Sequence, residues 1–204
     1  MASPNLFHGS LPFELGEDLR SLNPHWQGKP GPQVPAFRGW IFPRLLRLLT
    51  SGLTPATVLR GPRRVGKTVL LRQIMEQFLA DGVTPHRILY VPFDEIESLG
   101  EIKDPVLTIA RWFEQSILKR TFNELAREGG TAYLLLDDVQ NLDAWAPQIK
   151  HLLDNHQARA LIACRFSHRI EADLVRLAGR ITTVDVGPLT PSEIGDLRTL
   201  ENDA

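Results

Sequence analysis

Along most of the chain, short continuous runs of apolar residues alternate with longer stretches in which apolar residues recur at helical spacing. The runs predict strands, and the longer stretches predict helices. Short runs are continuously apolar, which is typical of parallel strands that are buried on both faces. The expected strands are residues 57–59, 87–91, 133–136, 160–163 and 181–186. Longer stretches between them place apolar residues on one helical face. The expected helices are residues 43–51, 67–80, 105–127, 146–155 and 170–178, and another begins at residue 191. This alternation predicts an α/β domain with a parallel sheet.

Polar residues, prolines and glycines mark the ends of several of these segments. Asp104 stands before Pro105, the order expected of a helix N-cap followed by proline at the first helical position. Gly129 and Gly130 should end the long helix that follows, and Gly179 is a candidate C-cap. Residues 1–36 are rich in Pro, Gly, Ser and Asn and show no sustained period. We therefore expect an extended or partly ordered arm there.

The composition fits one soluble domain with its own core. The chain has 204 residues, and no run approaches the roughly 20 apolar residues that span a bilayer. The first twenty residues lack the charged-then-apolar order of a secretory signal. The single cysteine, Cys164, has no partner for an internal disulfide and fits a reducing compartment. We expect a cytoplasmic protein with no membrane contact.

The charge is unevenly distributed although the formal net charge is −1. No Asp or Glu occurs between Leu19 and Met75. The same stretch holds ten basic residues: Arg20, Lys29, Arg38, Arg44, Arg47, Arg60, Arg63, Arg64, Lys67 and Arg72. A local positive field suits a polyanion. This pattern alone leaves open a nucleoside triphosphate, a nucleic acid or a solvated linker with scattered arginines.

One motif gives the positive stretch a specific chemistry. Residues 61–68 read GPRRVGKT and match the P-loop pattern G-x-x-x-x-G-K-[ST], between an expected strand and an expected helix. The two glycines let successive N–H groups face one anion, and the helix start adds free donors. Lys67 should bridge the β- and γ-phosphates, and Thr68 should place its hydroxyl on Mg²⁺. The expected nucleotide-binding residues are Gly61, Pro62, Arg63, Arg64, Val65, Gly66, Lys67, Thr68 and Val69.

An acidic pair supplies the second half of such a site. Leu134–Leu136 run into Asp137 and Asp138, about 70 residues after the loop. We expect Asp137 to hold Mg²⁺ through water, and Asp138 to orient or deprotonate an attacking water. The alternative is that either carboxylate only caps the loop after the strand.

These motifs resemble those of prokaryotic AAA+ ATPases whose second motif reads L-D-E-[IV]-Q-x-x-x-x-W. Gln140 and Trp145 match that spacing, and the resemblance covers about residues 38–198. It implies a three-layer α/β/α fold with a five-stranded parallel sheet in the order 5-1-4-3-2. It also implies ATP and Mg²⁺ as cofactors. The expected division is an arm at 1–36, the nucleotide-binding domain at 37–190, and the start of a lid helix at 191–204, with the rest of the lid and any C-terminal domain absent.

The chain departs from that family in two residues of chemical importance. Asp138 stands where the family has Glu, so its carboxylate should lie about 1.5 Å further back, and such a displacement can lower a rate about 100-fold. The fourth strand usually ends in a Thr-Gly-Ser-Ser-like sensor of the γ-phosphate, but here Arg165 and Ser167 are the candidates.

Arg180 lies where the resemblance implies an arginine finger. Such a residue contacts the γ-phosphate bound to a neighbouring subunit and raises the rate by orders of magnitude. Together with Lys67 and Asp138 it completes the expected catalytic set and implies a homo-oligomer. The alternative is a surface arginine that is favoured near a helix C-terminus.

Four functions compete on this sequence. The first is an ATPase, and the second is a nucleotide-dependent switch with little hydrolysis, which Asp138 and the altered sensor favour. The third is an ATP-dependent module that binds nucleic acid, although no specific nucleic-acid motif supports it. A P-loop kinase is weaker, because Gln140 and Trp145 fit the ATPase pattern.

Overall fold

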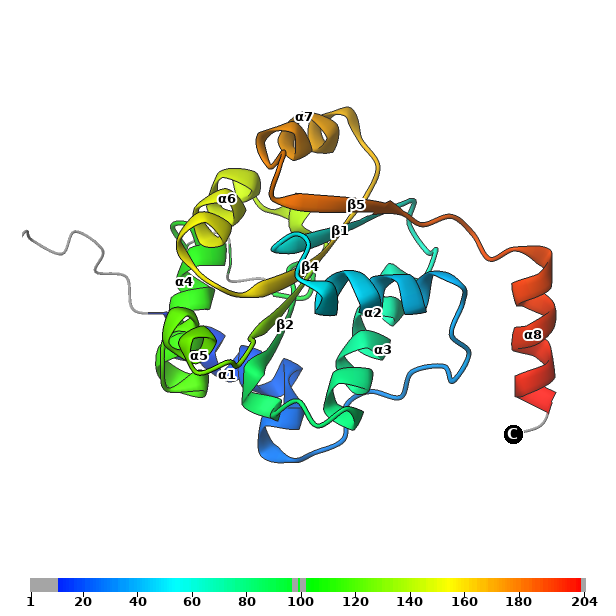
Figure 1. Ribbon diagram of the computed structural model, residues 1–204, viewed down its shortest axis with the longest axis horizontal. Coiled ribbons are helices and arrows are strands. Elements are labelled where there is room, and N and C mark those ends of the chain that lie inside the picture. Colours follow the sequence, from blue (N-terminus) through cyan, green and yellow to red (C-terminus); the bar gives the residue numbers. More distant parts are fainter. Residues whose placement is uncertain (1–10, 97–98, 100–101, 203–204) are drawn as a thin grey trace, which may run out of the picture.

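The chain folds around a five-stranded parallel sheet, and the computed structural model describes residues 11–96, 99 and 102–202 (Figure 1). The strands are β1 (Ala56–Arg60), β2 (Ile88–Pro92), β3 (Tyr133–Asp137), β4 (Arg159–Cys164) and β5 (Ile181–Asp185). Their spatial order is β2-β3-β4-β1-β5, with every neighbouring pair parallel. Read from the other edge this order is 5-1-4-3-2, so the expected fold is confirmed. All five expected strands lie within one or two residues of their predicted positions.

Helices cover both faces of the sheet, because successive strand residues point to opposite sides. Leu59 packs in a core with α2 (Ile41–Ser51) and α3 (Lys67–Ala80), whereas its neighbour Val58 packs in the core of the other face. That second face is covered by α1 (Phe13–Leu22), α4 (Pro105–Phe113), α5 (Phe122–Arg127), α6 (Trp145–Asn155) and α7 (His168–Arg176). Figure 1 shows the three layers, with α8 (Pro191–Asn202) standing apart beyond α2 and α3.

The single long helix expected over residues 105–127 is wrong. The chain instead forms α4, a π-helical turn η4 (Glu114–Leu118), a left-handed Lys119 with φ 61°, and then α5. Glu114 is buried, and its carboxylate accepts a hydrogen bond of 2.7 Å from the N–H of Phe122. Thr121 starts α5 with a capping box. A long-range acceptor and a local cap thus satisfy the backbone at the break, which helical periodicity alone did not reveal.

Asp104 and Pro105 take the expected N-cap and first helical positions of α4, but Asp104 does not provide the capping hydrogen bond. Asp104 has a left-handed backbone with φ 49°, and its side chain forms no capping hydrogen bond. Gln148 on α6 performs that function, because its Oε1 accepts from the N–H of Val106 at 2.9 Å. The start of α4 is therefore satisfied by a residue that is distant in sequence.

The N-terminal segment is more ordered than its composition suggested. Within residues 11–36 the structure has α1 and a 3-10 turn η1 (Pro24–Gln27), so of the two alternatives expected there the extended one is wrong for this part, and residues 1–10 of the arm lie outside the described residues. Asn23 is fully buried and pairs with both backbone groups of Tyr90, each at 2.8 Å. His25 Nε2 and Trp26 Nε1 lie 3.1 and 2.8 Å from the carbonyl oxygen of Ile88. These side chains cover the free edge of β2 and replace the neighbour strand that this edge lacks.

Residues 29–40 then cross α3 towards the start of α2. Gln73 on α3 donates to the carbonyl oxygens of Pro35 and Phe37, at 2.8 and 2.7 Å. This path brings Phe37 and Trp40 next to the loop between β1 and α3. No described helix is long and apolar enough to cross a membrane.

Candidate functional site

The loop between β1 and α3 lies at the carboxyl edge of the sheet and turns sharply. Arg64 and Gly66 have left-handed backbones, with φ 64° and 87°. A Cβ on Gly61 would lie 2.3 Å from the carbonyl oxygen of Val186, so only glycine fits that position. The loop leads into the first turn of α3 at Lys67. The free N–H groups of that turn, together with the helix dipole, form a region that favours an anion.

A cavity of about 700 Å³ opens beside this loop. Its lining residues are Arg63, Arg64, Gly66, Lys67, Thr68, Val69, Asp138 and Arg165. The structure therefore brings six of the nine expected loop residues together with Asp138, whereas Gly61, Pro62, Val65 and Asp137 do not line this cavity. The side chains of Arg63 and Arg64 form no ion pair or hydrogen bond with any other residue that the structure describes. Four cationic side chains and one carboxylate give the cavity the charge expected of a polyanion site.

Lys67 is folded back onto its own loop. Its Nζ donates to the carbonyl oxygens of Gly61 and Pro62, at 3.0 and 2.6 Å, and the side chain is buried. Burial lowers the pKa of Lys67, while the carboxylates of Asp138 and Asp137 act in the opposite direction. The neutral carbonyls are weaker partners than a charged phosphate would be. Lys67 is thus placed to exchange them for an anion in the cavity.

Asp137 ends β3 and is the most buried carboxylate of the site, with only 2% of its surface exposed. Its Oδ2 accepts a hydrogen bond of 3.4 Å from the hydroxyl of Tyr90, whereas its Oδ1 has no hydrogen-bond partner. Burial raises the pKa of Asp137 to about 6, which the Thr68 side chain partly opposes. A buried oxygen without a donor, next to a hydroxyl, suits a hard cation such as Mg²⁺. The residues present therefore fit that metal.

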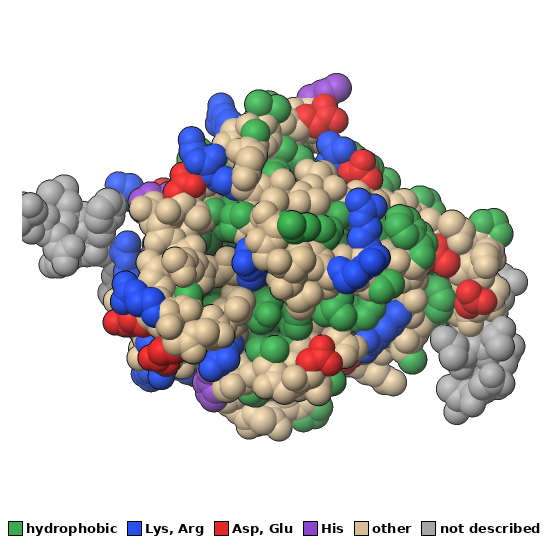
Figure 2. Space-filling model, viewed as in Figure 1, with side chains coloured by type: hydrophobic (Ala, Val, Ile, Leu, Met, Phe, Trp, Pro, Cys, Tyr) green, Lys and Arg blue, Asp and Glu red, His purple; other side chains and the backbone are tan. Residues whose placement is uncertain are grey.

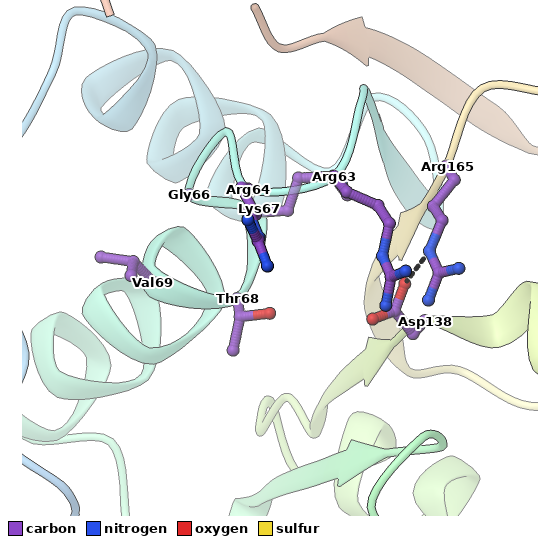
Figure 3. Close-up of a pocket in the computed structure, with 8 residues that line it drawn as sticks. All are labelled: Arg63, Arg64, Gly66, Lys67, Thr68, Val69, Asp138 and Arg165. Carbon is purple, nitrogen blue, oxygen red and sulfur yellow. Dashed lines mark ion pairs between the residues drawn. The ribbon is translucent and has the colours of Figure 1, made fainter. Parts of the chain in front are cut away.

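Asp138 is held by two neighbours. Its Oδ1 accepts 2.5 Å from Nε2 of Gln140 and lies 3.4 Å from Nε of Arg165. Figure 3 shows the guanidinium group of Arg165 beside this carboxylate, and Val69 pointing away from it. Ser167 does not line the cavity, because its Oγ caps α7 by accepting from the N–H of Ile170 at 3.2 Å. Of the two sensor candidates, Arg165 is the one at the cavity.

An apolar cavity of about 590 Å³ adjoins the cationic one across the loop, with Arg64, Gly66 and Val69 lining both. Its other walls include Phe37, Trp40, Ile41, Val65, Leu189 and Ile194. Glu193 on α8 closes one side, because its Oε1 accepts from the N–H of Trp40 at 3.2 Å. In Figure 2 basic side chains gather over β1 and α2, and apolar surface lies between them and α8. Sequence reasoning missed this cavity, because its walls come from three distant segments.

Arg180 does not join this site. It precedes β5, and its carbonyl oxygen accepts from the N–H of Ala56 at the start of β1, so it lies at the amino edge of the sheet. Its guanidinium makes two hydrogen bonds to the carboxylate of Asp154 on α6. Trp145 is buried at the start of α6, as expected of a packing residue.

The sheet order and the glycine-rich loop that leads into α3 define the class of P-loop α/β nucleotide-binding domains. The profile of a protein family described as AAA domain matches residues 53–195. Because this match covers well over half of the sequence, the chain belongs to that AAA-domain family. Membership supports nucleotide binding as the general activity of the domain.

Individual relatives add little about activity. The chain is similar to an uncharacterized protein of Haemophilus influenzae, with 26% identity over 137 residues, or 67% of this chain and 32% of that protein. It is similar in fold to a DNA polymerase III gamma subunit-related protein of Thermotoga maritima, with a TM-score of 0.51 and 15% identity over 76% of this chain and 48% of that one. A DNA replication initiation factor matches with a TM-score of 0.47 and 18% identity, over 80% and 49%. The chain thus spans about a third of the curated relative and about half of each solved chain.

Proposed function

We propose that the chain binds Mg-ATP between the two adjoining cavities and hydrolyses it. The observation that carries this proposal is the cationic cavity beside the α3 N-terminus, together with the buried, incompletely bonded Asp137 next to the side chain of Thr68, which lines that cavity. An ATP molecule has the matching parts: a tetra-anionic end, a site for a divalent cation and a flat apolar ring.

The triphosphate fits the loop and its cations. The backbone N–H groups of residues 63–68 would bind the phosphates, as in other helix-start anion sites. Lys67 would leave the carbonyl oxygens of Gly61 and Pro62 for phosphate oxygens. Arg63 and Arg64, which have no other partner among the described residues, would neutralise further charge.

Thr68 and Asp137 would hold Mg²⁺, which shields the phosphate charge when it is bound. Both are oxygen donors, and Oδ1 of Asp137 is available for a ligand or a coordinated water. The base would enter the apolar cavity, where Trp40 and Ile41 offer surfaces for a flat ring.

Asp138 would orient the attacking water and accept its proton. Lys67 would stabilise the negative charge that develops on the phosphoryl oxygens. Arg180 would act on the nucleotide of a second copy, because it lies at the opposite edge of its own sheet.

A nucleotide-dependent switch with little hydrolysis is the second candidate. It is favoured by one observation: Asp138 is already engaged by Gln140 and Arg165. A carboxylate oxygen that already accepts from two donors is less available to an attacking water than a free one. Both candidates share the same nucleotide site and differ only in turnover.

The test measures binding by calorimetry and steady-state turnover of ATP in Mg²⁺. For Lys67→Ala we expect nucleotide affinity to fall about tenfold or more, because a charged hydrogen-bonding partner of the phosphates is lost, and turnover to disappear. Lys150→Ala, an exposed change on α6, is the matched control and should behave as the unmodified chain. Equal affinity in both variants would refute the nucleotide site.

Asp138→Asn separates the two candidates. A hydrolase should keep its affinity for ATP and lose turnover about 100-fold or more, which is the usual contribution of a general base. A switch should show the same negligible turnover before and after the change.

A further inference from the structure

A third cavity, of about 320 Å³, lies where the N-terminal segment meets α3 and β2. Among the residues that the structure describes, it shares none with the walls of the cationic and apolar cavities. More than half of its lining residues fall within 21–32, outside the residues 53–195 that match the AAA-domain family. We propose that this space, the N-terminal cavity, binds the zwitterion of a free α-amino acid with an apolar side chain.

Two side chains of opposite charge lie together at the N-terminal cavity. Arg72 on α3 and Glu95 in the loop after β2 both line it, and Nη2 of Arg72 lies 3.6 Å from Oε1 of Glu95. This distance is longer than that of a usual charged hydrogen bond, so the pair is loosely held. The two side chains are 25% and 46% exposed. Each of them therefore has access to a partner from solution.

Tyr90 on β2 supplies an aromatic wall next to the cation. The guanidinium carbon of Arg72 lies 5.6 Å from the centroid of the Tyr90 ring, within the range of a cation–π contact. Tyr90 is buried, and its hydroxyl donates to Asp137 at 3.4 Å. The ring thus offers apolar surface to a ligand and restricts the positions that the guanidinium of Arg72 takes.

The remaining walls are mostly apolar. Met75 on α3 is 5% exposed, and Pro24, Pro30 and Pro32 come from the N-terminal segment. Proline has no backbone N–H, so these three residues add no such donor for an anion. A methionine side chain adapts its shape to the group that it contacts. An apolar side chain would therefore bury its surface against this part of the cavity.

The arrangement of charges favours a zwitterion over other small ligands. Glu95 would repel a simple anion, and Arg72 would repel a simple cation. A free amino acid carries a carboxylate for Arg72 and an ammonium for Glu95 on one carbon atom, so it satisfies two charges that lie side by side. A residue inside a peptide has lost both groups. The volume is also at the lower end of ligand pockets, which favours a single amino acid over a longer chain.

The experiment measures binding by calorimetry in the absence of nucleotide, so its result is independent of the proposed nucleotide site. The probes are L-leucine and three relatives that each lack one feature. N-acetyl-L-leucine has no ammonium, L-leucinamide has no carboxylate, and glycine has no apolar side chain. L-leucine should bind, and each relative should bind about tenfold or more weakly, because one charged or apolar contact is lost. L-methionine and L-phenylalanine test other sizes of side chain.

Two variants test which charge binds which group. Arg72→Met keeps an unbranched side chain and should weaken binding of L-leucine about tenfold or more, but not that of L-leucinamide. Glu95→Gln should weaken binding of L-leucine by a similar factor, but not that of N-acetyl-L-leucine. The matched control is Arg176→Met, because the guanidinium of Arg176 also lies 3.6 Å from a carboxylate, that of Asp173, but on the surface of α7. It should bind L-leucine as the unmodified chain does.

Four results would overturn the proposal. The first is that L-leucine, L-methionine and L-phenylalanine all fail to bind at millimolar concentrations. The second is that N-acetyl-L-leucine binds as tightly as L-leucine, which would make the cavity a simple anion site. Unchanged affinity for L-leucine in both cavity variants would place its binding elsewhere on the chain. Equal losses for L-leucine and L-leucinamide in Arg72→Met would indicate a damaged cavity rather than a lost carboxylate contact.

Discussion

At Asp137, the stability of the fold and the proposed binding of Mg²⁺ favour opposite charge states of the carboxyl group. Its carboxylate is buried with one oxygen unbonded, and burial raises its pKa from the ordinary 3.8 to about 6. A raised pKa means that the folded chain holds this proton more tightly than the unfolded chain. The contribution of Asp137 to the free energy of unfolding is then most favourable below about pH 3.8, and it is lost as the pH rises through 6. A bound cation would offset the charge that costs stability above that range.

We therefore expect Asp137→Asn to stabilise the metal-free chain at pH 8. The gain should reach about 3 kcal/mol at most, which is the free energy that corresponds to this change in pKa. The gain should shrink towards zero near pH 4. Chemical denaturation in EDTA at both pH values measures it.

The same variant should fail to respond to magnesium. With ADP already present, added MgCl₂ should raise the thermal midpoint of the unmodified chain at pH 8 but leave that of Asp137→Asn unchanged. A variant that is less stable than the unmodified chain at pH 8 would contradict this account of the site.

Among the structural elements, β2 depends most on side chains from elsewhere. It is an edge strand, and Asn23 binds it as a neighbouring strand would, through both the N–H and the C=O of Tyr90. The hydroxyl of Tyr90 also reaches Asp137. The N-terminal segment thus supports the strand that contacts the acidic end of the site.

Asn23→Ala should lower the free energy of unfolding by about 2–4 kcal/mol, because buried backbone groups of Tyr90 lose their partners. Asn123→Ala is the matched control, since Asn123 also binds two backbone groups, of Asn155 and Gln157, but at the surface. We expect Asn123→Ala to lower the free energy of unfolding by less than about 1 kcal/mol. Urea denaturation of the two variants measures both values, and similar losses would argue against the edge-covering role.

The elements that the sequence predicted well are those with local periodicity. The five strands and the glycine-rich loop before α3 follow from short patterns, and the strand order from the family resemblance. The missed features depend on contacts between distant residues. Asn23 gives no local signal that it will bind Tyr90, 67 residues away. The break at Lys119 likewise depends on Glu114 reaching Phe122.

The residues of the candidate site fall into the same two groups: those that a short local motif reveals, and those whose contacts join distant parts of the chain. The loop residues and the acidic pair are contiguous motifs, so the sequence shows them directly. The link from Gln140 to both Asp138 and Arg165 joins the ends of two parallel strands. Knowing that β3 and β4 are neighbours would have predicted that these ends meet, but not which side chains bond.

At the scale of the whole molecule, the parallel sheet separates the cationic cavity from Arg180. All strands point the same way, so the loop after β1 and the residue before β5 lie at opposite edges. The five residues of β1 alone place these edges about 16 Å apart. Arg180 is thus too far to act on the nucleotide of its own chain, and we propose that it acts on that of a second copy.

Mixing two inactive variants tests this proposal. Lys67→Ala retains Arg180, and Arg180→Ala retains an intact nucleotide cavity, so a mixed oligomer contains some complete sites. We expect ATP turnover in the mixture to exceed the sum of the separate variants, and turnover of the unmodified chain to rise faster than linearly with concentration. Asp154→Asn removes the partner of Arg180 without removing the arginine, and it should keep its turnover. If Asp154→Asn loses as much as Arg180→Ala, and mixing restores nothing, then Arg180 serves only to hold α6 against β5.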